Sequence, residues 1–476
     1  MIFNSIAFIV FFIIFYTIYL SIRKREYRIF LIFLGSYIFY GWWDWRFLSL
    51  ILFSTIVDYI IGNKIFQETS DKKRKKFLIL SLISNLGLLF LFKYFNFFID
   101  SFVDIANVIG LSPSIHTLQI ILPVGISFYT FQTLSYTIDI YRRKLNPEPH
   151  FLTFASYVAF FPQLVAGPIV RAIDLLPQFK INHKITIAQV KVGISLIILG
   201  YFKKLVIADS LAPLVDDAFA NPSGYTSLNM AIVVFFYAFQ IYCDFSGYSD
   251  IAIGLGKMLG FNFPVNFNLP YLSKNFSDFW KRWHISLSSW LKDYLYIPLG
   301  GNRKGGFFTF RNLMITMLLG GLWHGANWTF IIWGFLHGTY LIIQRSFKPI
   351  FKYLNRILPK SLITLFGIII TFLFVSFAWI FFRSQTISEA FDIIQKIISF
   401  EDMSFSALRT KFQLLKAFLI IGILFFSETT YFLFEEKINS ILHKKSYLQL
   451  FINAFLIWMI LLFGSFSNNN FIYFQF

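Results

Sequence analysis

Charged side chains are scarce in this chain. Asp, Glu, Lys and Arg make up 14% of its 476 residues, whereas a soluble domain carries roughly 25%. Hydrophobic residues make up 57%, and the mean hydropathy is +0.64. These values exclude a soluble multidomain protein. They predict an integral membrane protein, whose length allows about a dozen spans of ~20 residues with their loops.

Cysteine is nearly absent, because Cys243 is the only one. A disulfide within the chain and a thiolate metal cluster are therefore excluded. Cys243 lies in an apolar stretch, where a single cysteine is more often a small packed side chain than a nucleophile. The spacing of His284, His324 and His337 matches no short zinc pattern. A metal site would need ligands assembled by the fold alone, and we predict none.

Acidic residues are few, with 24 against 42 basic ones, which gives a net charge of +18. In a soluble protein this excess would suggest nucleic acid as a partner. Here the basic residues form short runs between apolar segments, at 23–25, 72–76, 142–144, 203–204 and 444–445. The positive-inside rule gives this distribution to cytoplasmic loops, which also attract anionic lipid heads. We expect the lipid bilayer, and no nucleic acid, as a partner.

Apolar length and charged punctuation together predict the membrane spans. They are residues 2–20, 28–42, 46–66, 77–98, 119–140, 188–208, 228–243, 311–345 (broken at its glycines), 361–382, 413–433 and 447–466. Placing the run 23–25 in the cytoplasm puts Met1 outside. We expect an all-α, polytopic membrane protein with roughly 11–13 helices. Residues 1–476 are expected to form a single transmembrane domain.

Residues 261–310 differ from the apolar blocks on both sides, because they are rich in Asn, Ser, Lys, Trp and Tyr. Residues 275–293 show helical periodicity, with tryptophans on one face and Lys281 and Lys292 on the other. An interfacial amphipathic helix explains these residues but not His284. We expect a water-facing site in this polar segment, and a catalytic region at about 261–345.

No Asp, Glu, Lys or Arg occurs from 312 to 344, yet His324 and His337 lie there. An ionisable side chain at bilayer depth costs free energy, so it is by default a functional hypothesis. Glycines on both sides of His324 would leave room for another molecule. A buried structural imidazole is the competing interpretation. On one straight helix His337 would lie ~20 Å from His324, which favours a structural role for His337.

A neutral imidazole with a reference pKa of ~6.5 takes a proton from a hydroxyl, as acyl transfer to an alcohol requires. The developing oxyanion needs a donor, from a second histidine or from Arg282. Neither Ser286 nor Cys243 lies in a nucleophile-elbow sequence, so we favour direct transfer over an acyl-enzyme. Asp244 and Tyr248 are four residues apart and align on a helix, either as a structural network or as the lining of a tunnel.

Six motifs occur in order along nearly the whole chain. They are Phe160-Phe-Pro-Gln-Leu-Val-Ala-Gly-Pro-Ile169, Tyr242-Cys-Asp-Phe-Ser-Gly-Tyr-Ser-Asp250, Phe279-Trp-Lys-Arg-Trp-His284, Tyr294-Leu-Tyr-Ile-Pro-Leu-Gly-Gly-Asn302, Gly320-Gly-Leu-Trp-His-Gly325 and Phe471-Ile-Tyr-Phe-Gln-Phe476. In these motifs the chain resembles the membrane-bound O-acyltransferase family, and within it the bacterial branch of the alginate O-acetylation membrane subunit.

The resemblance implies that His324 is catalytic and His284 its partner, inside a ring of helices around a polar tunnel. It implies acyl transfer, above all of acetyl, from a cytoplasmic thioester such as acetyl-CoA to hydroxyls of an extracytoplasmic polysaccharide, alginate-like or another envelope glycan. A partner of the SGNH-hydrolase-like type is expected outside the bacterial inner membrane. The expected substrate contacts are Lys281, Arg282, Trp283, Trp323, Asp244 and Tyr248.

Two alternatives stay open at this point. A transporter or flippase for a lipid-linked sugar would use the same polar segment and the same buried acidic residues. A scaffold of a polysaccharide-export complex would need no turnover of its own. Labelled acetyl-CoA separates the enzyme from both, because only the enzyme moves the label to a polymer or a partner. The identity of the acceptor polymer is not decided by the motifs.

Overall fold

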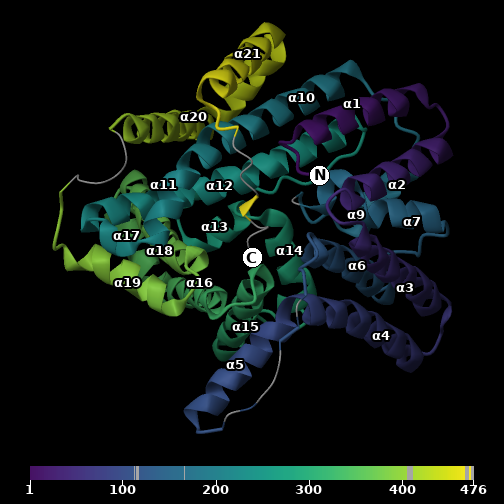
Figure 1. Cartoon of the computed structure of the whole chain (residues 1–476), viewed down its shortest axis with the longest axis horizontal. Coiled ribbons are helices and arrows are strands. Elements are labelled where there is room, and N and C mark those ends of the chain that lie inside the picture. The colour runs from purple at the N-terminus through teal and green to yellow at the C-terminus, as the bar shows by residue number, and fades with distance from the viewer. Residues whose placement is uncertain are drawn as a thin grey trace. The chain divides into compact units, whose positions relative to one another are not determined.

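The computed structural model describes the chain except for residues 112, 114–116, 119, 166, 405–410, 467–470 and 473–476. Most of the terminal motif therefore lies outside the described residues. Helices dominate the described ranges, which contain no β-strand (Figure 1). The chain divides into two compact units, formed by residues 1–194 with 251–264 and by residues 195–250 with 265–476.

The expectation of an all-α, polytopic membrane protein is confirmed. Within the described residues, five helical segments are long and apolar enough to cross a membrane, namely Trp45–Gln67, Asp71–Val108, Ser227–Met258, Lys360–Arg383 and Gln413–Leu442. Each provides an apolar window of membrane-crossing length with at most two charged residues. The single domain and the ring of helices around a tunnel stay predictions.

The first unit holds the N-terminal helices. These are α1 (Ile6–Ser21), α2 (Arg25–Gly41), α3 (Leu48–Gln67), α4 (Asp71–Leu89), α5 (Phe95–Val108), α6 (Ile126–Tyr141), α7 (Phe151–Val158), α8 (Phe161–Leu164), α9 (Ala172–Phe179) and the start of α10 (Ile187–Tyr201). The helices α3, α4 and α6 pack together around buried Asp58. Its carboxylate accepts hydrogen bonds from Ser81 at 2.6 Å and Asn85 at 2.9 Å, so hydroxyl and amide donors satisfy it.

The second unit holds the remaining helices and all three histidines singled out from the sequence. Its helices are the end of α10, α11 (Asp209–Ala220), most of α12 (Ser227–Met258), α13 (Phe276–Arg282), α14 (Ile285–Leu291), α15 (Gly306–His324), α16 (Trp328–Ser346), α17 (Lys348–Ile357), α18 (Lys360–Arg383), α19 (Ile387–Ser399), α20 (Lys411–Lys444) and α21 (Ser446–Phe463). The predicted catalytic region, residues 261–345, thus falls on short helices and on the α15–α16 pair.

The basic pair at 203–204 does not lie in a cytoplasmic loop, so this part of the charge interpretation is wrong. Both lysines lie in a π-helical turn, Phe202–Ala208, and both are buried. Lys203 pairs with Asp250 at 2.7 Å. Lys204, only 1% exposed, pairs with Asp209 at 2.9 Å and with Asp244 at 2.7 Å. The acidic residues on α11 and α12 compensate the two charges and allow their burial.

Residues 275–293 do not form one helix, contrary to the periodicity. The first helix, α13, ends at Arg282, and His284 takes a left-handed backbone with φ 44°. A second helix starts at Ile285 because Asn266 caps it: the Asn266 carbonyl oxygen accepts from the N–H of Ile285 at 2.9 Å, and its side chain accepts from the N–H of Ser286 at 3.2 Å. The break turns His284 away from the course of α13.

The stretch 311–345 is broken next to a glycine, as predicted. Helix α15 ends at His324, and Asn327 caps α16 by accepting a hydrogen bond from the N–H of Thr329 at 3.0 Å. The sequence predicted that the glycines leave room for another molecule, and this prediction is wrong. A Cβ on Gly321 would overlap the carbonyl oxygen of Phe330, and one on Gly325 would overlap the Phe330 ring. These glycines instead allow α15 and α16 to pack closely.

We predict that Gly321→Ala destabilises the protein. The new methyl group must push α16 away from α15, which costs about 1–3 kcal/mol. Thermal unfolding of the purified protein in detergent measures the loss. Gly422→Ala on α20 is the matched control, because a Cβ there meets nothing within 4 Å. Equal stability of Gly321→Ala and the control would contradict this account of the packing.

Candidate active site

The two predicted catalytic histidines come together in the second unit. His324 is the last residue of α15, and His284 precedes α14. Their ring centroids lie 6.4 Å apart, although forty positions separate them in the chain. His284 is 0% and His324 3% exposed. The fold therefore places two imidazoles side by side in a buried setting.

The side chain of Asn266 fixes the orientation of the His284 ring. The backbone N–H of Ser286 donates to Asn266 Oδ1 at 3.2 Å, so this atom is the amide oxygen. His284 Nδ1 lies 3.2 Å from the same oxygen and must carry the hydrogen to form a hydrogen bond there. The amide nitrogen of Asn266 donates to Ser249 at 3.1 Å on its other side. The neutral His284 ring therefore presents the lone pair of Nε2.

The Nε2 atom of His284 is buried and has no hydrogen-bond partner among the described residues. His284 lies outside the five candidate spans. Burial lowers its pKa from 6.5 to about 3, so the ring is neutral at physiological pH. The left-handed backbone of His284 costs about 1–3 kcal/mol, and such outliers concentrate at functional sites.

Aromatic rings enclose both histidines. Phe245 lies edge-on to His284 with centroids 4.6 Å apart. Around His324, the centroids of Trp323, Trp333 and Phe382 lie at 5.1, 5.0 and 5.3 Å. These walls keep the local polarity low, which strengthens any electrostatic interaction formed inside.

His337 lies closer to the site than the sequence suggested. We had placed it ~20 Å from His324 on one straight helix, but the chain turns back at residues 325–327. The ring of Trp333 contacts both histidines, with centroids 5.0 Å from His324 and 4.7 Å from His337. Phe279 stacks on His337 at 5.9 Å. His337 is thus packed into the wall behind His324, and its structural role stays our prediction.

Asp244 and Tyr248 both contact the buried ammonium group of Lys204. Asp244 binds Lys204 through one carboxylate oxygen, and its other oxygen accepts from the backbone N–H of Ile472 at 2.7 Å. The Lys204 ammonium lies 5.5 Å from the centroid of the Tyr248 ring. The ring of Phe471 packs against Tyr248 at 4.5 Å. Asp244 therefore holds residues from the end of the chain inside the second unit.

Phe471 links this ion pair to the histidines. Its ring centroid lies 5.7 Å from that of Phe245, and Phe245 contacts His284. The sequence pointed to Asp244 and Tyr248 as polar groups on one helix face, which agrees with their positions. It could not reveal Lys204 as their neighbour, because Lys204 lies about forty positions before them in the chain.

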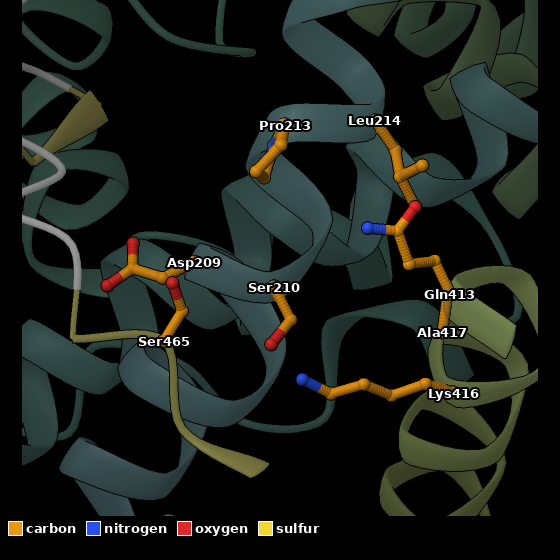
Figure 2. A pocket seen from close by; sticks show the side chains of 8 residues that line it. All are labelled: Asp209, Ser210, Pro213, Leu214, Gln413, Lys416, Ala417 and Ser465. Atoms are coloured by element: carbon orange, nitrogen blue, oxygen red, sulfur yellow. The ribbon is translucent and has the colours of Figure 1, made fainter. Parts of the chain in front are cut away.

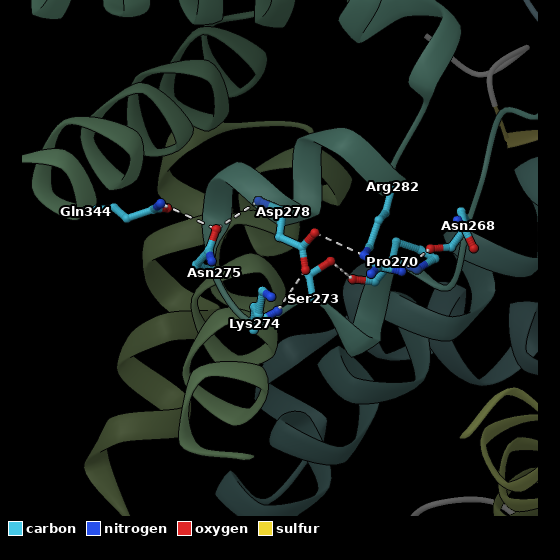
Figure 3. A network of polar contacts seen from close by, with 8 residues as sticks. All are labelled: Asn268, Pro270, Ser273, Lys274, Asn275, Asp278, Arg282 and Gln344. Atoms are coloured by element: carbon cyan, nitrogen blue, oxygen red, sulfur yellow. Dashed lines mark hydrogen bonds and ion pairs between the residues drawn. The ribbon is translucent and has the colours of Figure 1, made fainter. Parts of the chain in front are cut away.

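The remaining predicted substrate contacts differ in exposure. Lys281 is exposed, whereas Trp283 and Trp323 are buried. Arg282 is half-buried and donates to Asp278 at 3.1 Å and to the carbonyl of Asn268 at 3.2 Å. Figure 3 shows that this ion pair belongs to a network that also caps the start of α13. Arg282 therefore holds the α13 segment, and its contact with a substrate stays a prediction.

A separate cavity of about 160 Å³ lies between α11 and α20. Figure 2 shows the side chains that line it. It is lined by Asp209, Ser210, Pro213, Leu214, Gln413, Lys416, Ala417 and Ser465. Lys416 donates to the carbonyl of Phe463 at 2.9 Å. Since Asp209 both lines this cavity and pairs with Lys204, the cavity borders the ion pair that holds the end of the chain.

Fold and site together define a multi-pass membrane protein with two adjacent buried histidines. The sequence profile of the membrane-bound O-acyltransferase family matches residues 38–387. The chain belongs to this family and is an acyltransferase. Family membership supports the enzyme over the transporter and scaffold alternatives.

Curated relatives agree with this assignment. The chain is 43% identical to the probable alginate O-acetylase AlgI of Azotobacter vinelandii, over 86% of this chain and 80% of the relative. It is 39% identical to the peptidoglycan O-acetyltransferase of Helicobacter pylori, over 78% and 74%. It is 29% identical to the teichoic acid D-alanyltransferase of Streptococcus thermophilus, over 56% and 68%. The names of all three describe acyl transfer.

We predict that Lys204→Met destabilises the protein strongly. The substitution leaves Asp209 and Asp244 buried without a cation, and breaking a buried pair in this way costs about 3–5 kcal/mol. Lys191→Met on α10 is the matched control, because Lys191 is exposed. Thermal unfolding in detergent compares the two variants. A Lys204→Met protein as stable as the control would show that the ion pair is dispensable.

We predict that Asn266→Ala slows acyl transfer about 10²-fold, because His284 loses the acceptor that sets its tautomer. Asn266→Asp keeps an acceptor oxygen for Nδ1–H and restores part of the rate. Asn268→Ala is the control, since Asn268 is exposed and only its backbone takes part in the network. Initial rates with labelled acetyl-CoA in membrane vesicles, scaled to folded protein, provide the comparison. Equal rates for Asn266→Ala and Asn268→Ala would contradict this role.

Proposed function

We propose that the chain transfers acetyl groups from a cytoplasmic thioester, such as acetyl-CoA, to hydroxyls of an extracytoplasmic polysaccharide of the bacterial envelope. Relatives named for O-acetylation of alginate and of peptidoglycan support acetyl as the acyl group and a glycan as the acceptor. The observation that carries the proposal is the pairing of His284 and His324 at 6.4 Å inside an aromatic enclosure. We favour an alginate-like polymer, because the chain is 43% identical to the alginate O-acetylase and 39% identical to the peptidoglycan O-acetyltransferase.

The chemistry requires one proton acceptor and one leaving group. The acceptor hydroxyl attacks the carbonyl carbon of the thioester, and its proton passes to the His324 imidazole. The C–S bond then breaks, and the same proton passes from the imidazolium to the departing thiolate. Atoms and charges balance without a co-reactant. The same sequence applies whether the hydroxyl belongs to the polymer or to a serine of a partner protein.

As the partner of His324, His284 would either donate a hydrogen bond to the thioester oxygen or accept a proton, and its tautomer supports the second role. A donor to the thioester oxygen would need a hydrogen on Nε2, but Asn266 places the hydrogen on Nδ1. We therefore assign His284 to the proton path, as an acceptor next to His324. On this path the proton of the His324 imidazolium passes to His284 and back before it reaches the departing thiolate. Because burial disfavours the cationic form of His284, the proton stays there only while the reacting oxyanion supplies a compensating charge.

The membrane arrangement follows from the charge pattern. We propose a cytoplasmic (inner) membrane location, with the N-terminus outside, because the basic runs 23–25 and 72–76 then face the cytoplasm. Lys281 is exposed and suits attraction of an anionic donor, with Arg282 beside it. A polar tunnel and an SGNH-hydrolase-like partner on the outer side complete the proposed path of the acetyl group.

We predict that His324→Ala abolishes acetyl transfer, with a loss of at least about 10²–10⁴ in rate, because the attacking hydroxyl loses its base. The measurement follows labelled acetyl from acetyl-CoA into polymer or partner protein in membranes. His150→Ala is the control, since His150 is exposed and belongs to the first unit. Normal transfer by a folded His324→Ala protein would exclude the proposed role.

A further inference from the structure

The segment that joins α16 to α18 carries an unusual charge distribution. Residues 345–360 include five basic side chains and no acidic one. The helix α17 occupies the middle of this segment, between the apolar helix α16 and the candidate span α18. A ten-residue helix between two apolar helices is too short to cross a bilayer. It therefore lies just before the chain enters the candidate span α18.

The basic residues of α17 form one stripe. Lys348, Lys352 and Arg356 are spaced by four residues, which aligns them along one side of the helix. All three are exposed. No ion pair with an acidic residue occurs at these three positions in the described part of the chain. Their charge is therefore available for an anionic partner.

The opposite side of α17 is apolar and also exposed. Ile350 is 51%, Tyr353 61% and Ile357 59% exposed. At 100° per residue these three side chains span about 60° of the helix circumference, and their centre lies roughly 130° from that of the basic stripe. The residues that the structure describes leave this face uncovered, so it suits an apolar environment outside them. A helix with these two faces is typical of one that lies in the membrane interface.

We propose that α17 lies in the plane of the cytoplasmic membrane surface and binds anionic phospholipid headgroups. Its apolar face enters the acyl-chain boundary, and its basic stripe contacts the lipid phosphates. The positive-inside rule places five basic residues without an acidic one on the cytoplasmic side. An anionic soluble donor fits the stripe less well, because it would leave the exposed apolar face unexplained.

The test uses a local reporter of lipid composition. Cys243 is buried, so Ile357→Cys provides the one exposed cysteine for a fluorophore. The protein is placed in nanodiscs of equal parts phosphatidylglycerol and phosphatidylcholine, and energy transfer to headgroup-labelled lipid of either kind is measured. We expect phosphatidylglycerol to be enriched at position 357. The triple variant K348Q, K352Q and R356Q should reduce the enrichment about fivefold for each cation removed, until it reaches the bulk ratio.

The control removes equal charge elsewhere. Lys72, Lys75 and Lys76 are exposed and belong to the first unit, so their substitution by Gln should leave the enrichment at position 357 unchanged. Equal transfer from both lipids in the parent protein would overturn the proposal. Loss of the enrichment in the control triple would overturn it as well. A parent-like enrichment in the α17 triple, with a raised KM for acetyl-CoA, would assign the stripe to the anionic donor instead.

Exchanging Lys352 and Tyr353 tests the orientation at constant charge. The exchange moves a cation onto the apolar face and an aromatic ring onto the basic stripe. We expect a spin label at position 357 to lose accessibility to oxygen and to gain accessibility to a water-soluble nickel chelate. Unchanged accessibilities, with the parent label already in water, would show that α17 does not enter the bilayer.

Discussion

The amide of Asn266 holds the candidate site together. Its oxygen accepts hydrogen bonds at the start of α14 and lies against His284 Nδ1, so one side chain caps this helix and orients the histidine before it. The same contact decides which nitrogen of the buried imidazole carries the hydrogen. The backbone carbonyl of Asn266 also accepts from the N–H of Ile285, so Asn266 helps twice to hold the left-handed backbone of His284. The orientation and the tautomer of this ring therefore depend on Asn266.

Buried charge is the second constraint on this fold. Lys204 satisfies two aspartates, and one of these holds the backbone N–H of Ile472. A charged pair at this depth costs free energy unless every member is paired. The arrangement joins the π-helical turn Phe202–Ala208, α11, α12 and Ile472. Phe471 and Phe245 continue it towards His284. The ion pairs that stabilise this unit are therefore connected, through Phe471, to the Phe245 ring packed against His284.

Much of this could be predicted from the sequence, because apolar length and charge runs reflect the bilayer directly. The all-helical class and the break next to Gly325 followed from local patterns. The pairing of His284 with His324 was implied by the family resemblance, and their catalytic roles stay predictions. The interpretation failed where tertiary contacts overrode a local signal. The basic pair at 203–204 indicated a cytoplasmic loop. In the structure both lysines are buried, because aspartates compensate their charges. The periodicity of 275–293 indicated one helix, because Asn266 could not be assigned as the cap of a helix that begins about twenty residues later.

The central claim is that His284 stands beside His324 as a neutral ring with a bare Nε2. Nitrogen NMR of ring-labelled histidine in membranes tests it most directly, with the His284 signals assigned by their absence in His284→Gln. The account predicts a hydrogen on Nδ1 at neutral pH and an unprotonated Nε2. A signal from the opposite tautomer, or from a doubly protonated ring, would contradict the assignment of His284 to the proton path.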